Sequence, residues 1–437
     1  MASPNTSPPS GMRDFLPGEL RARERVFAAV RTTFESYGFA PLQTPAVERL
    51  EILQGKYGEE GDRLIFKLAQ RGAKAAEEAD LALRYDLTVP LARVAAEYQN
   101  RLGRIFKRYQ AGPVWRADRP GRGRFREFNQ CDIDTIGATF GLADAETLLA
   151  LSGALAAVGL GGFVLRLNSR KVLHGVIEVF GIPAEQAPGV LTALDKLDKI
   201  GWEGVVAELT TERGLGGETA GRLTGTVQDE AELRRFLAGS AVGAEGLAEV
   251  DSLIGLVAPL LAGGRVVFTP SLARGLSYYT GPIFEIYVPE FPSAIASGGR
   301  YDGLIGIFAG RQIPAVGGSL GIERIIPLVA AGTEEVVSPA RVLVGVWDAA
   351  ARPQALATAA GLRAAGIAAE VYLGADRTGD QIGYAASRGI GFIVLQGPQE
   401  REAGAVAVRN LATREQATVP SDELAAHLNS ILGVGSG

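Results

Sequence analysis

Arginine is concentrated in one short segment of this sequence, where its charged side chains can bind phosphate. Between Arg101 and Arg126 there are nine basic residues and a single acid, Asp118. A guanidinium group donates paired hydrogen bonds that fit phosphate oxygens, and the nearby ring of Phe128 can stack on a nucleobase. The segment therefore favours a nucleotide site. A solvated basic surface is the alternative.

Two expected strands position these side chains. Residues 108–115 and 125–136 have strand-like patterns, and the polar turn 119–123 separates them. Because side chains alternate along a strand, several arginines and one aromatic ring can point into one cleft. The residues that share faces in this way are Arg116 and Asp118 on one strand, and Arg124, Arg126 and Phe128 on its partner.

Three further segments contain residues suited to ligand binding. Residues 272–280 place an arginine before two adjacent tyrosines, and residues 296–303 predict a glycine-rich turn that contains Arg300. Residues 317–324 combine glycines with Arg324 at the start of a helix. Two adjacent tyrosines face opposite sides of a strand, whereas a loop lets both line one pocket. No P-loop and no convincing dinucleotide-binding fingerprint accompanies these segments.

Hydrophobic periodicity predicts the scaffold. Short strands within residues 81–136 and again within residues 265–320 predict an antiparallel sheet. Between them, residues 169–262 are rich in Ala, Leu and Glu at helical spacing and predict a mostly helical insertion. The expected fold of residues 1–330 is therefore α+β.

The rest of the chain has a different pattern. After an expected linker at residues 331–340, strands alternate with helices from residue 341 to residue 437. This alternation predicts a small C-terminal α/β domain with a largely parallel sheet.

Composition excludes several classes of protein. The chain has 437 residues, of which 47% are hydrophobic and 21% charged, as in globular proteins of two or three domains. One cysteine, Cys131, and two histidines cannot supply the usual zinc ligands, so no zinc is expected. The N-terminus has no signal-peptide pattern and no apolar run could span a bilayer, so we expect a cytoplasmic protein without membrane association.

In this order, the segments resemble the motifs of the class II aminoacyl-tRNA synthetases, and of the histidyl family specifically. The resemblance covers nearly the whole chain. Pro45 resembles the proline of motif 1, and residues 84–90 resemble the family's amino-acid-binding strand. Segments that match longer motifs are the opening 11–17, motif 2 at 116–130, motif 3 at 317–324, and the two histidine-specific signatures at 272–279 and 298–303.

The resemblance implies a function and a domain organisation. The expected enzyme activates L-histidine with ATP to histidyl-adenylate and pyrophosphate, then transfers histidine to the 3′ end of tRNA(His). Residues 1–330 would form the catalytic domain and residues 341–437 an anticodon-binding domain. Motif 1 implies a homodimer. Mg²⁺ is expected with ATP as substrate, without a metal site made by the protein alone.

The resemblance also implies individual roles. Arg274 and Arg116 are the expected catalytic residues, and Arg119 and Arg122 the expected contacts to the tRNA acceptor end. The expected histidine-binding residues are Asp86, Thr88, Arg116, Gln130, Asp134, Arg274, Tyr278 and Tyr279. The expected ATP-binding residues are Arg116, Asp118, Arg126, Phe128, Gly321 and Arg324.

Some positions depart from the family pattern. Ser277 stands where the family often has Asp, and Gly379 and Gly383 occupy a segment that is often basic. Residues 341–437 hold eight basic and nine acidic residues, which weakens the case for strong electrostatic tRNA binding there.

Two kinds of alternative stay open at this point. Asp86 or Asp134 can pair an arginine for purely structural reasons, and the motif aromatics can belong to a core. The rival function is a non-catalytic, histidine-sensing regulatory subunit of ATP phosphoribosyltransferase. Such paralogues usually lack the anticodon-binding domain and lose catalytic arginines. This chain keeps Arg116, Arg274 and Arg324 and has the expected C-terminal domain.

Overall fold

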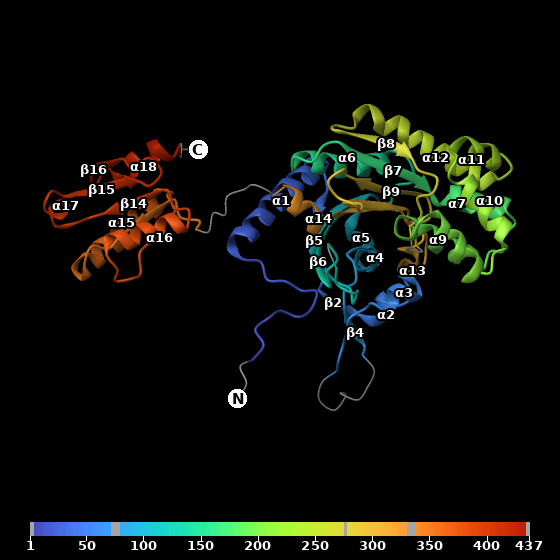
Figure 1. The fold of residues 1–437 in the computed structure, drawn as a ribbon, viewed down its shortest axis with the longest axis horizontal. Coiled ribbons are helices and arrows are strands. Elements are labelled where there is room, and N and C mark those ends of the chain that lie inside the picture. Colours follow the sequence, from blue (N-terminus) through green and yellow to red (C-terminus); the bar gives the residue numbers. More distant parts are fainter. Residues whose placement is uncertain (1–3, 71–78, 122, 275–277, 330–337, 434–437) are drawn as a thin grey trace. The chain divides into compact units, whose positions relative to one another are not determined.

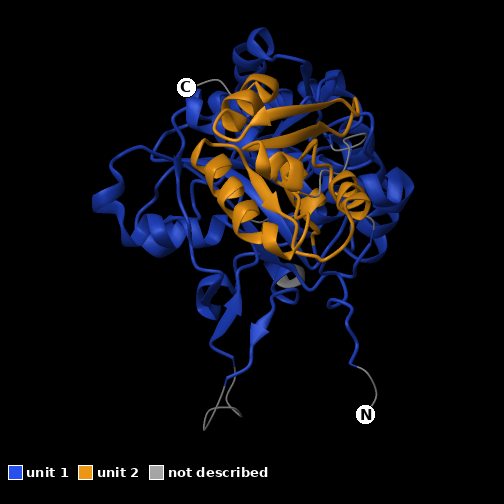
Figure 2. Ribbon diagram, turned by 90° about the vertical axis from the view of Figure 1, so that its left-hand side faces the viewer, with its two compact units in different colours: residues 1–14, 23–331 blue, residues 15–22, 332–437 orange. Residues whose placement is uncertain are grey.

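The structure, a computed structural model, describes residues 4–70, 79–121, 123–274, 278–329 and 338–433. Figure 1 follows the chain by colour from the N-terminus to the C-terminus. The chain divides into two compact units, coloured in Figure 2. Unit 1 consists of residues 1–14 and 23–331, and unit 2 of residues 15–22 and 332–437.

An eight-stranded sheet forms the centre of unit 1, with strand order β1-β5-β6-β11-β10-β9-β7-β8. All neighbours pair antiparallel except at the two edges, where β1 with β5 and β7 with β8 are parallel. The predicted antiparallel sheet is confirmed. Its strands are β1 Ala40–Pro41, β5 Phe106–Trp115, β6 Glu127–Ile136, β7 Phe163–Ser169, β8 Gly264–Phe268, β9 Pro282–Tyr287, β10 Ala296–Arg300 and β11 Ala315–Gly321.

One face of this sheet is apolar and packs against helices. Cys131 and Ile133 of β6 are buried in a core to which four helices contribute. Since side chains alternate along a strand, the polar residues at positions 130, 132 and 134 point to the opposite face. The four helices are α1 Pro17–Ser36, α6 Leu142–Ala157, α12 Ala241–Val257 and α14 Ile322–Val329.

The predicted helical insertion lies between β7 and β8 in the sequence (Figure 1). Its helices bury a second apolar cluster that includes Val176, Leu191 and Leu233. No helix in the described ranges is long and apolar enough to cross a membrane. Besides α12, the insertion contains α7 Arg170–Val179, α8 Ala187–Asp195, α9 Leu197–Thr211, α10 Gly217–Thr226, α11 Glu230–Leu237 and the 3₁₀ helix η2 Ala258–Leu260.

The first of the strands expected within residues 81–136 is not part of the eight-stranded sheet. It is β4, and it belongs to a separate three-stranded sheet of order β2-β4-β3. Helix α4 begins at Thr88 and has Pro90 in its first turn, where proline is tolerated. Asp86 therefore lies just before this helix and not in a strand. The elements here are β2 Val47–Arg49, β3 Lys67–Leu68, β4 Leu81–Leu83, α2 Leu50–Leu53, α3 Gly58–Asp62, α4 Thr88–Glu97, α5 Gln99–Leu102 and α13 Gly306–Ala309.

The prediction of a glycine-rich turn at residues 296–303 is wrong for residues 296–300, which form β10; the turn follows at residues 302–303. The glycines allow neighbouring backbones to approach. A Cβ atom on Gly298 would lie 2.2 Å from the carbonyl oxygen of Gly317, and one on Gly299 would lie 2.6 Å from that of Pro282. In this strand glycine serves close packing rather than turning.

Unit 2 contains a five-stranded sheet of order β13-β12-β14-β15-β16. Crossover helices make β12, β13 and β14 parallel, as predicted, but β15 and β16 pair antiparallel. The sheet is therefore half parallel, because the last connections are too short for a crossover. Its elements are β12 Val342–Val344, η3 Ala349–Ala351, α15 Arg352–Ala364, β13 Ala369–Val371, α16 Thr378–Ser387, β14 Phe392–Leu395, α17 Pro398–Glu402, β15 Ala405–Asn410, β16 Gln416–Pro420 and α18 Leu424–Leu432.

Candidate active site

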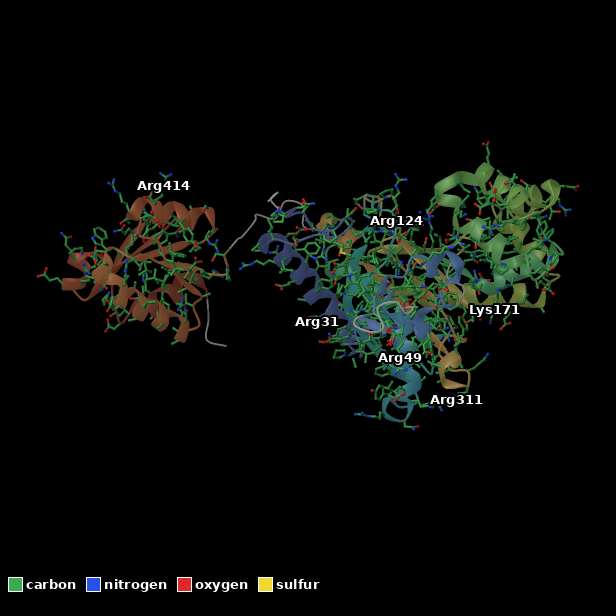
Figure 3. The ribbon with its side chains drawn as sticks, turned by 90° about the horizontal axis from the view of Figure 1, so that it is seen from below. Arg31, Arg49, Arg124, Lys171, Arg311 and Arg414 are labelled. Carbon is green, nitrogen blue, oxygen red and sulfur yellow. The ribbon has the colours of Figure 1, made fainter. Side chains whose placement is uncertain are left out.

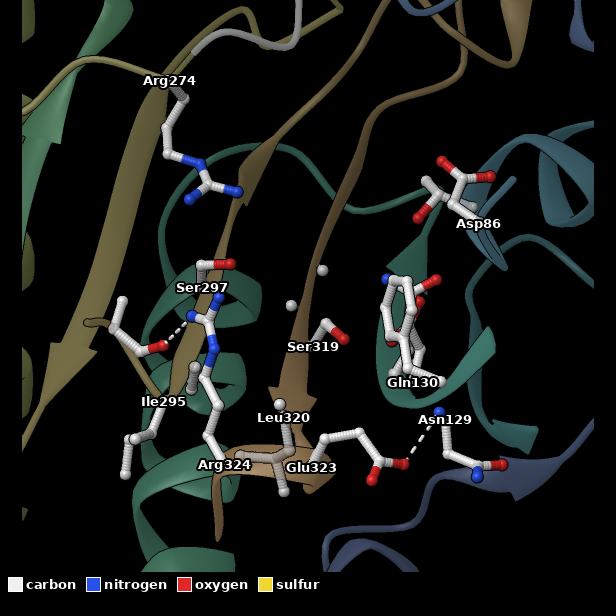
Figure 4. A pocket seen from close by; sticks show the side chains of 18 of the residues that line it. Asp86, Asn129, Gln130, Arg274, Ile295, Ser297, Ser319, Leu320, Glu323 and Arg324 are labelled. Carbon is white, nitrogen blue, oxygen red and sulfur yellow. Dashed lines mark hydrogen bonds between the residues drawn. The ribbon is translucent and has the colours of Figure 1, made fainter. Parts of the chain in front are cut away.

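The polar face of the large sheet forms the floor of a cavity of about 410 Å³ in unit 1 (Figure 4). That volume is typical of small-ligand sites. The residues of β11 that face the acids of β6 are small, which leaves room above these acids. The facing pairs of the two strands are Gln130 with Gly321, Asp132 with Ser319, and Asp134 with Gly317.

Most of the predicted site residues line this one cavity. The two adjacent tyrosines both line it, because they lie in a loop and not in a strand. Arg126 does not line the cavity. Its Nε donates a hydrogen bond to the carbonyl oxygen of Asp118 at 3.0 Å. Arg119 is exposed outside the cavity, and Arg122 and Ser277 lie outside the described residues. The predicted residues that line it are Asp86, Thr88, Arg116, Asp118, Phe128, Gln130, Asp134, Arg274, Tyr278, Tyr279, Gly321 and Arg324.

Asp86 is buried at the turn before α4. Its Oδ1 accepts hydrogen bonds from the Tyr57 hydroxyl at 2.9 Å and from the backbone N–H of Val89 at 3.0 Å. Burial raises the pKa of Asp86, although the Val89 N–H and the charge of Arg116 partly oppose this shift. A buried carboxylate of this kind favours a cationic ligand.

Arg116 is held between two aromatic rings. Its guanidinium carbon lies 4.4 Å from the ring centroid of Tyr85 and 5.1 Å from that of Phe128. Its Nε donates to the carbonyl oxygen of Tyr85 at 3.1 Å. These contacts fix the guanidinium in the cavity while its remaining N–H groups can bind an anion.

Asp134 is paired with a buried arginine, as expected if it has a structural role. Its Oδ2 lies 2.6 Å from Nη2 of Arg108, whose side chain is fully buried, and its Oδ1 accepts a hydrogen bond from the Tyr301 hydroxyl. Burial raises the pKa of Asp134, and Arg108 opposes the rise. A carboxylate has about four lone-pair positions, so these partners orient Asp134 without exhausting its capacity to accept a ligand N–H.

Arg274 lies across the cavity from Asp86 (Figure 4). It forms an ion pair with Glu285 of β9. Glu285 also accepts a hydrogen bond from the Tyr287 hydroxyl at 2.6 Å, and that hydroxyl lies 2.9 Å from Oδ2 of Asp198 in the insertion. Tyr287 and Glu285 thus connect helix α9 to Arg274 through a series of polar contacts.

Comparison with known proteins identifies the family. The family model of histidyl-tRNA synthetase matches residues 11–325, and the anticodon binding domain model matches residues 325–431. The chain belongs to the histidyl-tRNA synthetase family. The predicted class II synthetase fold with its C-terminal anticodon-binding domain is confirmed.

Individual relatives agree over nearly the full length. The histidine–tRNA ligase of Rhodopirellula baltica is 39% identical over 421 residues, which cover 94% of each chain. The crystal structure of histidyl-tRNA synthetase from Nostoc sp. PCC 7120 superposes with a TM-score of 0.81 at 34% identity, covering 98% of this chain and 100% of that one. A Bacillus halodurans C structure, described as an ATP phosphoribosyltransferase regulatory subunit/histidyl-tRNA synthetase, is 25% identical with a TM-score of 0.72, covering 88% and 97%.

In this member of the histidyl-tRNA synthetase family, two arginines near the N-terminus contact residues that line the cavity. Glu323 accepts hydrogen bonds from Arg23 at 2.6 and 2.8 Å and from the Asn129 backbone N–H at 3.2 Å, and it also pairs with Arg13. The guanidinium of Arg13 stacks 3.6 Å from the ring centroid of Phe125. Segments resembling motifs 2 and 3 are thereby joined to the chain's opening.

Sequence reasoning missed several residues that line the cavity. Alternation along β6 should have indicated Asp132, because it lies midway between Gln130 and Asp134 on the same face. Asp195 of the insertion carried no sequence signal. Others that were not assigned a role are Asn129, Ser297, Tyr301, Ser319 and Glu323.

Within the described parts of the chain, no three His, Cys, Asp or Glu side chains are grouped so that they could hold a metal ion. Burial raises the pKa of Asp132 to about 7, with Arg108 opposing and Asp134 reinforcing the rise. The buried carboxylates of this histidyl-tRNA synthetase site therefore suit N–H donors of a ligand.

Proposed function

We propose that this cavity binds histidine beside ATP and that Arg274 and Arg116 promote their reaction. The chain is an aminoacyl-tRNA synthetase of the histidyl family, whose substrates are histidine, ATP and tRNA. One observation carries the residue-level proposal: buried Asp86 lies on one side of the cavity, while Arg274 and Arg324 lie on the other (Figure 4). That division of charge suits an amino acid whose carboxylate meets a nucleotide.

Histidine would bind at the acidic side. Asp86, Thr88 and Gln130 would hold its α-ammonium group, because a carboxylate and neutral oxygens are the acceptors that a cation prefers. Asp134 and Tyr279 would bind the N–H groups of the imidazole ring, next to Tyr278. A buried polar site of this kind discriminates against side chains that leave its groups unpaired.

ATP would bind at the basic side. Phe128 would stack on the adenine, Arg324 would bind the γ-phosphate, and Gly321 would let the nucleotide approach the strand. Asp118 would take part in nucleotide binding as well. Arg126 is supported less well than the others, because it does not line the cavity.

The reaction needs little covalent help from the protein. A carboxylate oxygen of histidine attacks the α-phosphorus, and the bond to the departing pyrophosphate breaks. Arg116 would hold the carboxylate and α-phosphate, and Arg274 would stabilise the charge that develops there. The Mg²⁺ expected with ATP would neutralise the leaving pyrophosphate when bound.

Transfer to tRNA is the second step of the proposal. The loop 119–123 would contact the acceptor end, since it is basic and Arg119 is exposed. Arg124, just beyond it, has a side chain that is 56% exposed (Figure 3). Replacing Arg119 and Arg122 with alanine is expected to raise the KM for tRNA and slow transfer; unchanged values would overturn this assignment.

The regulatory alternative is not favoured, because full-length relatives are histidine–tRNA ligases. A homodimer and a cytoplasmic location stay predictions; a monomeric mass at micromolar concentration would contradict the first. The test of the overall function is transfer of labelled histidine to tRNA by the purified protein. Charging of tRNA(His) with histidine is expected, and histidine binding without charging would favour the regulatory alternative.

A further inference from the structure

Two buried side-chain oxygens on the cavity floor have neither a hydrogen-bond partner nor an ion-pair partner among the described residues. They are Oδ1 of Asp132 and Oε1 of Gln130. Asp132 is only 2% exposed. An unpaired buried acceptor is unfavourable, so two of them in a ligand cavity indicate that a ligand supplies the N–H donors.

Asp132 is firmly positioned in the sheet. It lies directly opposite Ser319 of β11, and the nearby hydroxyl of Ser319 favours its ionised form. Because Gln130 is two residues away on the same strand, its amide oxygen is on the same face.

The other acidic groups are partly occupied. Asp86 already accepts from Tyr57 and Val89 through Oδ1, and Asp134 is engaged by Arg108 and Tyr301. An α-ammonium group has three N–H donors and needs three acceptors. Asp86 alone cannot supply them. Thr88 and Gln130 can contribute one oxygen each, and the unpaired Oδ1 of Asp132 offers a further, charged acceptor.

We propose that Asp132 is a further histidine-binding residue, a second carboxylate that accepts a hydrogen bond from the α-ammonium group. The inference rests on the proposed function, in which Asp86, Thr88 and Gln130 already surround that group. Burial raises the pKa of Asp132 to about 7, and an arriving ammonium group favours its ionised form. The imidazole end of histidine is left to Asp134.

The test is a comparison of ligands on the Asp132→Asn protein. Dissociation constants are measured by titration calorimetry for histidine, for histamine, which keeps the amine, and for 3-(imidazol-4-yl)propanoate, which lacks it. The variant is expected to weaken histidine and histamine binding by roughly 10- to 100-fold, the range for a hydrogen bond to a charged group. Binding of the deaminated analogue is expected to change less than about twofold, since that contact is absent.

Glu146→Gln is the matched control, an acid-to-amide change at a half-exposed side chain that pairs with Lys107 outside the cavity. It should leave all three constants unchanged, and thermal melting shows whether both variants fold. Equal weakening of all three ligands, or unchanged histidine affinity, would overturn the role of Asp132. Failure of the proposed function is distinguishable, because the unaltered protein would then show no charging of tRNA.

Discussion

Gly317 lies directly opposite Asp134 in the central sheet, and the carboxylate occupies the space that a side chain at Gly317 would need. A Cβ atom there would lie 1.9 Å from Oδ1 of Asp134. The absence of a side chain at position 317 therefore leaves room for the buried carboxylate of Asp134 to face the cavity. Residue 317 thus shapes the proposed histidine pocket through the space that it leaves for Asp134.

The Gly317→Ala change is expected to displace Asp134 and weaken histidine binding at least about tenfold, with some loss of stability from overpacking. Titration of histidine against the variant measures the effect. Gly379→Ala is the control, because a Cβ at Gly379 in α16 meets nothing within 4 Å. Unchanged histidine affinity in the Gly317 variant would mean that the pocket does not depend on this close approach.

Tyr301→Phe removes the hydroxyl that donates to Asp134 and leaves the ring in place. Loss of this bond frees the carboxylate to rotate, so the KM for histidine should rise about tenfold while the KM for ATP stays constant. Steady-state pyrophosphate exchange gives both constants. Tyr384→Phe is the control, since Tyr384 makes the same kind of bond to Glu370 in unit 2. A rise in both KM values would show a general disturbance of the cavity.

Glu285→Gln neutralises the carboxylate that holds Arg274. Because a positioned guanidinium stabilises charge that develops during reaction, kcat is expected to fall roughly 10- to 100-fold while the KM for histidine changes little. Glu230→Gln breaks the pair with Arg234 on the surface of the insertion and serves as control. If the Glu285 variant kept its full kcat, Arg274 would not need this partner.

Asp132→Asn is expected to stabilise the fold in a pH-dependent manner. The pKa of Asp132 rises from 3.8 to about 7 on folding, so the folded state binds a proton that the unfolded state releases between these values. Ionised Asp132 therefore lowers the free energy of unfolding progressively from about pH 4 to pH 7, by at most about 4 kcal/mol. The neighbouring charges are Arg108, Asp134 and Asp86.

Denaturant unfolding of both proteins at pH 5 and pH 8 tests this expectation. The variant should be the more stable at pH 8, and the difference should shrink at pH 5. An equal difference at both values would mean that Asp132 is ionised over the whole range. Greater stability with weaker histidine binding is the pattern expected when a buried charge is kept for function.

The sequence predicted the strands and helices whose periodicity was strong. Alternation identified β5 and β6, and helical spacing identified the insertion. It failed where glycine had a role in packing: residues 296–300 are a central strand because Gly298 and Gly299 accommodate neighbouring backbones. That role depends on contacts distant in sequence, which local pattern does not contain.

The same limit applies to the site. Motif resemblance identified Asp86, Arg116 and Arg274, all of which line the cavity. It did not identify Glu285 as the partner of Arg274, because that ion pair joins a loop to a strand through the fold. Alternation along β6 predicts that Asp132 faces the cavity, because it lies between Gln130 and Asp134 on the same face. The motif resemblance assigned roles only to those two residues.

The most direct test of histidine activation in this cavity is amino-acid-dependent ATP–pyrophosphate exchange by the purified protein, with and without Arg274→Ala. Exchange is expected with histidine and with no other amino acid, and the variant should lose at least about a hundredfold of it, as for removal of other transition-state charge stabilisers. Exchange with a different amino acid, or full histidine-dependent exchange in the variant, would contradict this expectation.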